Sequence, residues 1–423
     1  MSLVAVIGTG YVGLTTGAYL AHLGHNVTCA DVDADKIERL SRGEIPIVEA
    51  GLDELVKEGL DRGRLSFVLG AARAAAGAEF VFLCVPTPQG TDGSADMSYI
   101  QTAAREIGPV LDAEAVVINK STVPVGSTRV VEGALGRSDV FVVSNPEFLR
   151  EGSAVHDCLH PDRIVIGSDD QAAAIRVASL FEGIAAPLIV TDPASAETIK
   201  YASNAFLATK ISFVNAVANL CEAVGADVRE VILGIGYDKR IGFEFLKPGP
   251  GWGGSCFPKD TRAVIKIAED AGYDFGLLRG VISVNDEQHE RVTAKVVRLA
   301  GGSLDGVVVA AWGLTFKART DDLRDSPAIE ITRRLADRGA TVQAYDPTVR
   351  RELPGMKVMA DPYAACEGAS VLAVLTEWDE LRWLDFRKVH DVMARPTVVD
   401  ARNLLDPAAM RRWGFAYEGI GRS

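Results

Sequence analysis

The fold is decided by the stretch Leu3-Val4-Ala5-Val6-Ile7-Gly8-Thr9-Gly10-Tyr11-Val12-Gly13, an apolar run that ends in a glycine-rich turn. A helical pattern follows this turn and runs to Leu23. In a strand, turn and helix of this kind, Gly8 permits the tight turn, Gly10 lets a pyrophosphate approach the backbone, and Gly13 lets the helix pack on the strand. The amides at the start of the helix then face the phosphates. The stretch therefore predicts a dinucleotide-binding βαβ unit.

Asp31 ends the second predicted strand, about 20 residues beyond the glycines. A carboxylate there can accept hydrogen bonds from both ribose hydroxyls of NAD, and its charge would repel the 2′-phosphate of NADP. Lys36 either lies near the adenosine or is a surface lysine, and the sequence favours neither. The alternative for the whole motif is a glycine-tolerant turn with a solvated aspartate. We expect NAD as the cofactor, bound by Asp31 and by the turn residues Gly8, Gly10, Tyr11, Val12 and Gly13.

Short apolar runs alternate with helical stretches in the first half of the chain, which predicts a parallel sheet with crossover helices. The expected strands there are residues 3–7, 26–30, 80–85, 115–119 and 140–143. One long helix is expected over 194–225, then a loop rich in glycine and proline over 234–254, then helices over 258–271 and 275–299. Further strands are expected at 307–312, 341–345, 371–375 and 397–399, with a crossover helix over 326–338.

These patterns predict an α/β protein with two Rossmann-like parallel-sheet domains, joined by a central helical region that contains the long helix. We place an NAD-binding domain at residues 1–195 and a helical dimerisation domain at 196–300. The second Rossmann-like domain is expected at 301–423.

The composition argues against several classes of protein. With 57 Asp and Glu against 44 Lys and Arg, the chain has a formal charge of −13, which is unlike a nucleic-acid-binding surface. No apolar run approaches the roughly 20 residues that cross a bilayer, so we expect no membrane segment. The first residues lack a basic leader and a cleavage site, which predicts a cytoplasmic protein. The six cysteines are scattered without a Cys-x-x-Cys pair, so we expect neither disulfides nor a metal site.

A cysteine stands between a glycine-rich loop and a predicted helix start in the stretch from Phe245 to Asp260, which contains Gly249-Pro250-Gly251-Trp252-Gly253-Gly254-Ser255-Cys256. The field of a helix N-terminus favours the thiolate, and glycines before Cys256 would let a substrate approach. Asp260 lies one helical turn beyond the sulfur, within range of it or of a shared water. A buried structural thiol is the alternative, and we keep that interpretation for the other five cysteines.

Two further pairs of polar residues have four-residue spacing. Lys200 and Asn204 share one face of the long predicted helix, as part of a site or of a solvated face. Glu147 and Glu151 follow the fifth predicted strand, as site carboxylates or as ordinary acids at a helix N-terminus. Loops at the carboxyl ends of parallel strands bind ligands in α/β sheets, and Thr122, Pro86 and Thr87 occupy such loops too.

These motifs, in this order, closely resemble the UDP-glucose 6-dehydrogenase family over nearly the whole chain. The most specific elements are Gly253 to Asp260, Lys200 to Asn204, and Phe316-Lys317 followed by Arg324-Asp325-Ser326-Pro327. The resemblance implies a dinucleotide-binding domain, a helical middle that forms a homodimer, and a second domain that binds the UDP portion. One departure is Ala216, where many relatives have glutamate; it bears on the helix or dimer contact and removes no proposed active-site group.

The resemblance also implies roles for individual residues. The active-site positions are Thr122, Glu147, Glu151, Lys200, Asn204, Cys256 and Asp260. The substrate contacts are Glu147, Phe148, Leu149, Arg150, Glu151, Lys200, Asn204, Phe245, Leu246, Lys247, Pro248, Gly249, Gly253 and Lys317, with Arg240 reaching across the dimer and Arg402 near the uridine diphosphate. The cofactor contacts are Pro86, Thr87, Thr122, Lys259 and Arg324, besides the turn, Asp31 and Lys36.

The implied reaction oxidises the C6 hydroxyl of UDP-glucose to the carboxylate of UDP-glucuronate, a polysaccharide precursor, with two NAD and no metal. A water held by Asp260 and Lys200 accepts the first proton, and the Cys256 thiolate adds to the aldehyde before the second oxidation. Lys200 and Asn204 donate to the oxyanion, and Glu151 assists thioester hydrolysis through a water. Glu147 supports the site or positions the substrate.

Three other functions stay open at this point. A sibling enzyme would use the same thiol on GDP-mannose or UDP-N-acetylmannosamine. A two-electron dehydrogenase would release one NADH per substrate instead of two. A silent dinucleotide-binding regulator would keep the fold without the chemistry, although the intact set of Cys256, Lys200 and Asp260 argues against it.

Overall fold

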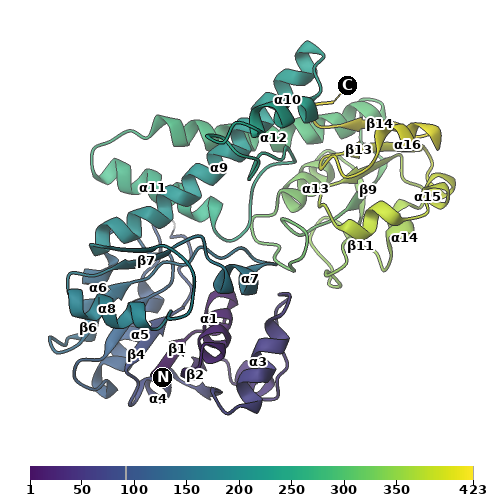
Figure 1. The fold of residues 1–423 in the computed structure, drawn as a ribbon. Coiled ribbons are helices and arrows are strands. Elements are labelled where there is room, and N and C mark those ends of the chain that lie inside the picture. Colours follow the sequence, from purple (N-terminus) through teal and green to yellow (C-terminus); the bar gives the residue numbers. More distant parts are fainter. Residues whose placement is uncertain (91–92, 423) are drawn as a thin grey trace. The chain divides into compact units, whose positions relative to one another are not determined.

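The computed structural model describes residues 1–90 and 93–422, which form two compact units. The first unit comprises Met1–Ser203 and Arg262–Gly272, and the second comprises Asn204–Thr261 and Tyr273–Ser423. Two of the three unit boundaries fall inside helices, namely α9 (Pro193–Val224) and α11 (Phe257–Asp270), and the third lies after α11, between Gly272 and Tyr273. Each unit contains one β-sheet flanked by helices (Figure 1).

The first unit is built on an eight-stranded sheet in the order β3-β2-β1-β4-β5-β6-β7-β8. Neighbouring strands are parallel except β6 and β7, which meet in an antiparallel pair. The strands are β1 (Leu3–Ile7), β2 (Asn26–Asp31), β3 (Leu65–Leu69), β4 (Phe80–Leu83), β5 (Val116–Asn119), β6 (Phe141–Ser144), β7 (Ile164–Gly167) and β8 (Leu188–Thr191). The helices that connect them are α1 (Tyr11–His22), α2 (Ala34–Ser41), α3 (Leu52–Asp61), α4 (Ala71–Ala75), α5 (Ser98–Ile107), α6 (Ser127–Leu135), α7 (Ala154–Leu159) and α8 (Gln171–Ser179), with a short 3₁₀ turn at Gly108–Val110.

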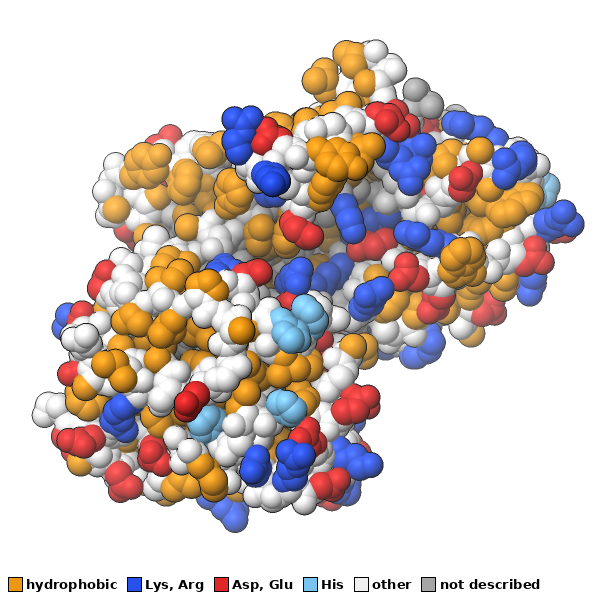
Figure 2. Space-filling view, in the orientation of Figure 1, with side chains coloured by type: hydrophobic (Ala, Val, Ile, Leu, Met, Phe, Trp, Pro, Cys, Tyr) orange, Lys and Arg blue, Asp and Glu red, His pale blue; other side chains and the backbone are white. Residues whose placement is uncertain are grey.

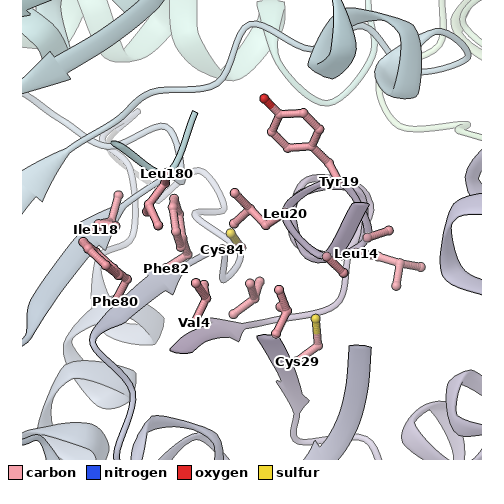
Figure 3. Packing of buried hydrophobic residues seen from close by; sticks show 14 of the residues in the cluster. Val4, Leu14, Tyr19, Leu20, Cys29, Phe80, Phe82, Cys84, Ile118 and Leu180 are labelled. Atoms are coloured by element: carbon pink, nitrogen blue, oxygen red, sulfur yellow. The ribbon is translucent and has the colours of Figure 1, made fainter. Parts of the chain in front are cut away.

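Alternate residues of the first strands point to two separate cores, because side chains in a strand alternate between its faces. Val4 and Val6 join the core that α1 covers, whereas Ala5 and Ile7 join the core under α4, α5 and α6. Figure 3 shows the first core, in which Leu14 and Leu20 of α1 lie over side chains of β1, β4 and β5. Helices on both faces explain why these strands are continuously apolar.

The second unit is built on a six-stranded parallel sheet in the order β11-β10-β9-β12-β13-β14. The strands are β9 (Val308–Trp312), β10 (Thr341–Tyr345), β11 (Lys357–Val358), β12 (Val371–Val374), β13 (Thr397–Asp400) and β14 (Ala416–Gly419). The other elements are α10 (Val228–Gly236), α12 (Gly276–Ala300), α13 (Pro327–Asp337), α14 (Pro362–Cys366), α15 (Phe386–Val392) and α16 (Pro407–Arg412), with a 3₁₀ turn at Asp379–Trp383.

In each sheet, an aspartate at the end of the second strand accepts hydrogen bonds from a threonine. Asp31, at the end of β2, accepts hydrogen bonds from the amide and hydroxyl of Thr9. Asp346, directly after β10, accepts from the amide and hydroxyl of Thr315, and it is fully buried. The indole of Trp378 also donates to Asp346, at 3.0 Å. The aspartate that corresponds to Asp31 is therefore inaccessible to a ligand in the second sheet.

The predicted fold class is confirmed, including both parallel sheets and the long helix. The sequence analysis did not predict strands β3, β7, β8, β11 and β14, all of which lie toward the edges of the sheets. β8 illustrates the reason, because Leu188, Ile189 and Val190 are all exposed and show no alternation of apolar and polar residues. Among the described residues, no helix combines the length and apolar character needed to cross a membrane.

Candidate functional site

The three glycines of the first turn are glycine for different structural reasons. Gly8 has a φ of +95°, and a Cβ there would lie 2.6 Å from the carbonyl oxygen of Cys84. A Cβ on Gly13 would lie 1.8 Å from the carbonyl oxygen of Gly8. At Gly10 the φ is −73°, and no atom lies within 4 Å of a Cβ. Gly8 and Gly13 are thus required by the chain itself, whereas Gly10 leaves open space in front of α1, where a pyrophosphate fits.

Asp31 is held as an ionised acceptor at the end of β2. Burial alone would raise its pKa, but hydrogen bonds from Thr9 and Lys36 outweigh this and lower the pKa to about 2. The Lys36 ammonium lies 2.9 Å from the Asp31 carboxylate, so Lys36 is positioned at the predicted ribose-binding acid. The turn, the acid and the open space at Gly10 together fit the ribose and pyrophosphate of NAD.

Replacing Gly10 with alanine is expected to weaken NADH binding by at least about tenfold, or about 1.4 kcal/mol. The added methyl meets no protein atom, so it would occupy space in front of the helix and obstruct the phosphates. Fluorescence titration with NADH measures the effect, and the thermal unfolding midpoint should stay close to that of the wild type. Gly13→Ala is the matched control, in which the folded state itself is destabilised. Unchanged NADH affinity in Gly10→Ala would disprove this role of the turn.

Three neighbouring strands carry the next group of predicted residues at their carboxyl ends. β4, β5 and β6 are adjacent and parallel, so the loops that follow them meet at one edge of the sheet. The Thr87 hydroxyl donates to the carbonyl oxygen of Thr122 at 2.9 Å, and the Ser121 hydroxyl donates to that of Val85 at 2.7 Å. The structure thus brings the Pro86–Thr87 and Thr122 loops together, as the sequence analysis expected.

Lys200 and Glu147 form a buried ion pair. Their charged atoms are 2.8 Å apart, and each side chain is about 5% exposed. Burial would raise the pKa of Glu147, but the charge of Lys200 and the hydrogen bonds from Lys200 and the amide of Leu149 lower it. The alternatives of a solvated helix face and of a helix N-terminal acid are both wrong, since α7 begins only at Ala154. A buried cation in this place is available to stabilise an oxyanion.

Glu147, Phe148, Leu149 and Arg150 line a cavity of about 150 Å³ in the first unit. Lys120 also lines it and donates to the side-chain oxygen of Asn145 at 2.9 Å. Burial lowers the pKa of Lys120. The sequence analysis did not select Lys120 as a site residue, although it lies two residues before Thr122 in the same loop.

Glu197 is a second buried group that the sequence analysis missed. Its carboxylate accepts from the amide of Gly126 at 2.6 Å and from the amide and hydroxyl of Thr128 at 3.0 and 2.9 Å. These groups start α6, just after the Thr122 loop. Because Glu197 is one turn before Lys200 in α9, it ties the helix that carries the lysine to that loop. The sequence signal that could have identified Glu197 is its three-residue spacing from Lys200, which places both on one face of the helix.

In the second unit, Asn204 and Asp260 are hydrogen-bonded at 2.6 Å, and both are buried. Lys259 lies 2.7 Å from the other oxygen of Asp260. The sequence analysis expected Asp260 within range of the sulfur or of a shared water. The Asp260 amide donates to the Cys256 carbonyl oxygen at 2.8 Å. The Asp260 carboxylate thus accepts hydrogen bonds on both of its oxygens.

Cys256 differs from the other cysteines in its exposure. It directly precedes α11 and is partly exposed, whereas the remaining five are buried, and all six are free thiols. Its sulfur lies 3.5 Å from the Ser255 hydroxyl. Within residues 1–90 and 93–422, no group of three or more His, Cys, Asp or Glu side chains could hold a metal ion. This partly exposed thiol next to a helix start is a candidate nucleophile.

We expected the glycines before Cys256 to leave space for a substrate to approach. In the structure, Gly253 and Gly254 instead make room for another segment of the chain. A Cβ on Gly253 would lie 2.0 Å from the carbonyl oxygen of Asp325, and one on Gly254 would lie 2.8 Å from the ring of Phe316. The amide of Gly254 also donates to the carbonyl oxygen of Arg324 at 3.1 Å. These two glycines let the thiol segment pack on the segment that precedes α13, so two of the specific motifs lie side by side.

Most of the other predicted substrate residues gather in the same unit. Arg402 lies beside Gly249 and donates to the carbonyl oxygens of Phe316 and Leu375. Phe245 has a positive φ of 62°, an uncommon conformation for a bulky residue. Lys317 lies over the ring of Phe316. Arg324, a predicted cofactor contact, is paired with Asp322. Arg240 belongs to this unit as well, but it is exposed and paired with Asp238 after α10.

Comparison with family models assigns a known description to each part of the chain. Residues 2–185 match the NAD binding domain of the UDP-glucose/GDP-mannose dehydrogenase family. Residues 194–287 match the central domain of that family, and residues 310–407 match its UDP binding domain. The three matches follow one another along the chain in the order that the sequence analysis expected.

Individual relatives cover the chain from end to end. It is 46% identical over 433 aligned residues to UDP-glucose 6-dehydrogenase of Rhizobium meliloti, with 99% of each chain covered. A solved UDP-glucose dehydrogenase of Pyrobaculum islandicum matches with a TM-score of 0.92 and 38% identity, over 100% of this chain and 98% of that one. A UDP-D-ManNAc dehydrogenase of Pyrococcus horikoshii matches with a TM-score of 0.89 and 28% identity, over 99% of each chain.

Proposed function

The chain belongs to the UDP-glucose/GDP-mannose dehydrogenase family, and we propose from this that it is an NAD-dependent enzyme that oxidises the C6 hydroxyl of UDP-glucose to the carboxylate of UDP-glucuronate. The observation that carries the proposal is the partly exposed Cys256 thiol at the start of α11 in a chain 46% identical to a UDP-glucose 6-dehydrogenase. A thiol is what one site needs to oxidise the same carbon twice.

The first oxidation needs a group that accepts the proton of the C6 hydroxyl. When bound, NAD supplies the hydride acceptor for each oxidation. We assign the proton to a water held by Asp260, since Asp260 is buried and held between Asn204 and Lys259. Breaking the C6–H and O–H bonds leaves an aldehyde on the sugar.

The second oxidation passes through the sulfur of Cys256. The thiolate adds to the aldehyde carbon, and the new alkoxide takes a proton to give a thiohemiacetal. Loss of a second hydride and of that proton would convert the thiohemiacetal into a thioester. Lys200 and Asn204 donate to the oxyanion as it forms and collapses. Glu147 holds Lys200 in place, and Glu151 orients the water that hydrolyses the thioester, which restores the thiol.

The number of NADH molecules released tests this proposal directly. With limiting UDP-glucose and excess NAD, absorbance of NADH should reach two equivalents per sugar nucleotide. A panel with GDP-mannose and UDP-N-acetylmannosamine under the same conditions should give much lower rates. One equivalent would support a two-electron dehydrogenase, and no NADH from any sugar nucleotide would support a dinucleotide-binding regulator. Faster turnover of another sugar would assign a sibling function.

UDP-N-acetylmannosamine is the second candidate substrate, because the enzyme that bears this name in Pyrococcus horikoshii shares the fold with a TM-score of 0.89. The identities favour UDP-glucose, at 38% for the Pyrobaculum islandicum enzyme against 28% for the Pyrococcus horikoshii one. The panel of sugar nucleotides decides between them.

We also propose a homodimer formed through α9, in keeping with the three-part division at residues 1–195, 196–300 and 301–423. Phe206, Phe213 and Leu220 are spaced seven residues apart on α9 and are between 55% and 65% exposed. Ala216 is exposed on the same helix. Hydrophobic side chains also show at the surface around α10 (Figure 2). A second copy would cover this stripe, and the exposed Arg240 is free to reach the other copy's substrate.

A further inference from the structure

The segment from Gly249 to Trp252 leads from the predicted substrate contacts to the thiol, and it is held by amide side chains on two helices. Asn215 lies on α9, while Asn285 and Gln288 lie on α12. All three are at most 7% exposed. They belong to the same compact unit as the segment and as Cys256.

The peptide groups of Gly249 are held from both sides. The Gly249 amide donates to the side-chain oxygen of Asn215 at 2.8 Å, and the Gln288 side-chain nitrogen donates to the Gly249 carbonyl oxygen at 2.8 Å. Gln288 is itself oriented, because its oxygen accepts from the side-chain nitrogen of Asn219 at 3.0 Å. The amide orientation of Gln288 is therefore determined by two separate contacts.

Trp252 is held by one side chain at both of its polar main-chain atoms. The Trp252 amide donates to the side-chain oxygen of Asn285 at 2.8 Å, and the Asn285 nitrogen donates to the Trp252 carbonyl oxygen at 3.0 Å. The Trp252 indole donates to the Ser212 hydroxyl at 2.9 Å. Between these points Gly251 has no room for a side chain, since a Cβ there would lie 2.6 Å from His289 and 2.9 Å from Asn285.

Neutral amides suit this task better than charged groups. Asn285 presents an acceptor oxygen and a donor nitrogen, so it pairs with a backbone N–H and a backbone carbonyl without placing a charge in the buried region. Asn215 uses its oxygen, and Gln288 its nitrogen, on the backbone of Gly249. A buried backbone group that lost its partner would be costly, so the segment is restricted to this conformation. Only Gly253, Gly254 and Ser255 separate Trp252 from the nucleophile.

We propose that Asn285, Gln288 and Asn215 are positioning residues that fix the peptide groups of Gly249 and Trp252 and thereby set the location of the Cys256 thiol for attack on the sugar aldehyde, an inference that rests on the proposed function. Their effect is indirect, since they act on the backbone and not on the substrate. A shift of about 1 Å in a reacting group can cost about 100-fold in rate. The second oxidation needs the thiol and the first does not, so the two steps should respond differently.

Asn285→Ala tests the inference by stopped-flow measurement of NADH in single turnovers with UDP-glucose. The first hydride transfer should stay within about threefold of the wild type, while the second should slow by about 10- to 100-fold. NADH affinity and the thermal unfolding midpoint are measured alongside to confirm that the variant is folded. If Asn285→Ala does not fold, Gln288→Met carries the same comparison, because it removes the donor to Gly249 at similar side-chain length.

Asn285→Asp provides a rescue that a merely structural role would not produce. A protonated carboxyl can accept from the Trp252 amide and donate to its carbonyl oxygen, as asparagine does, whereas a carboxylate cannot donate. The second hydride transfer, relative to the wild type, should therefore recover as the pH falls from 8 to 6. His289, the titratable group beside Gly251, stays neutral in this range, because burial and Arg334 lower its pKa to about 4. Asn285→Ala should show no such recovery.

Glu287→Gln is the matched control, since Glu287 is exposed on α12 and pairs only outward with Arg291. It should match the wild type in both steps. Equal slowing of both hydride transfers in Asn285→Ala, or no slowing of either, would overturn the inference. A wild-type protein that releases no NADH from UDP-glucose would instead overturn the proposed function, so the two failures are distinguishable.

Discussion

Replacing Cys256 with serine is expected to lower steady-state turnover of UDP-glucose by about 10³-fold or more. A hydroxyl in this position is a far weaker nucleophile, and an ester-like adduct is hydrolysed slowly, so the enzyme should stall after the first turnover. Rapid mixing should show a burst of NADH followed by a very slow phase. Mass spectrometry of the quenched protein should detect the sugar adduct at position 256.

Ser255→Ala is the matched control for this experiment. It removes the hydroxyl that lies 3.5 Å from the sulfur but keeps the thiol, so it should still release two NADH per UDP-glucose. The proposal fails if Cys256→Ser turns over UDP-glucose to two NADH at the wild-type rate. It also fails if the adduct forms on one of the five buried cysteines instead.

Replacing Lys200 with methionine is expected to destabilise the fold by about 3–5 kcal/mol and to lower turnover by at least about 100-fold. The substitution leaves the Glu147 carboxylate buried without its cation, which is the costly way to break such a pair. Urea unfolding measures the loss of free energy of unfolding, and steady-state NADH formation measures the loss of turnover. The double variant Lys200→Met/Glu147→Gln should regain stability but not activity.

The pH dependence of this variant follows from the pKa of Glu147. In the wild type that pKa is lowered, so the pair stabilises the fold above the ordinary carboxyl value and the contribution disappears as the pH falls through the lowered pKa. Without Lys200, burial dominates and raises the pKa. The difference in stability between variant and wild type should therefore be largest near pH 7 and shrink toward pH 5. A difference that grows toward pH 5 would contradict the assignment of the charge to Glu147.

The parts of the fold that sequence could predict are those decided by local chain geometry. The glycine turn before α1 and the acid at Asp31 follow from the needs of a tight turn and a strand end, and the apolar strands of both sheets show as buried runs. Cys256 was identifiable because a thiol between a glycine-rich loop and a helix start is unusual. The long helix α9 was predictable because it lacks proline and interior glycine.

The parts that sequence could not predict depend on contacts between distant segments. Lys200 and Glu147 are 53 residues apart, and nothing in either motif says that they pair. Gly253 was expected to make room for a substrate, but the room is taken by the carbonyl oxygen of Asp325. The amide contacts of Asn285 and Gln288 arise because α12 packs on the thiol segment, and both residues lie in a helix whose sequence shows no site motif.

The burial of Asp346 has a consequence for the order of events in a catalytic cycle. Trp378 and main-chain amides close this acid off from any ribose, whereas Asp31 remains partly open, so the second sheet does not offer a matching acid to a second dinucleotide. In the four-electron reaction that we propose, both NAD molecules would therefore bind at the first sheet, one after the other. The covalent bond to Cys256, rather than non-covalent affinity for the aldehyde, would retain the half-oxidised sugar while NADH is exchanged for NAD.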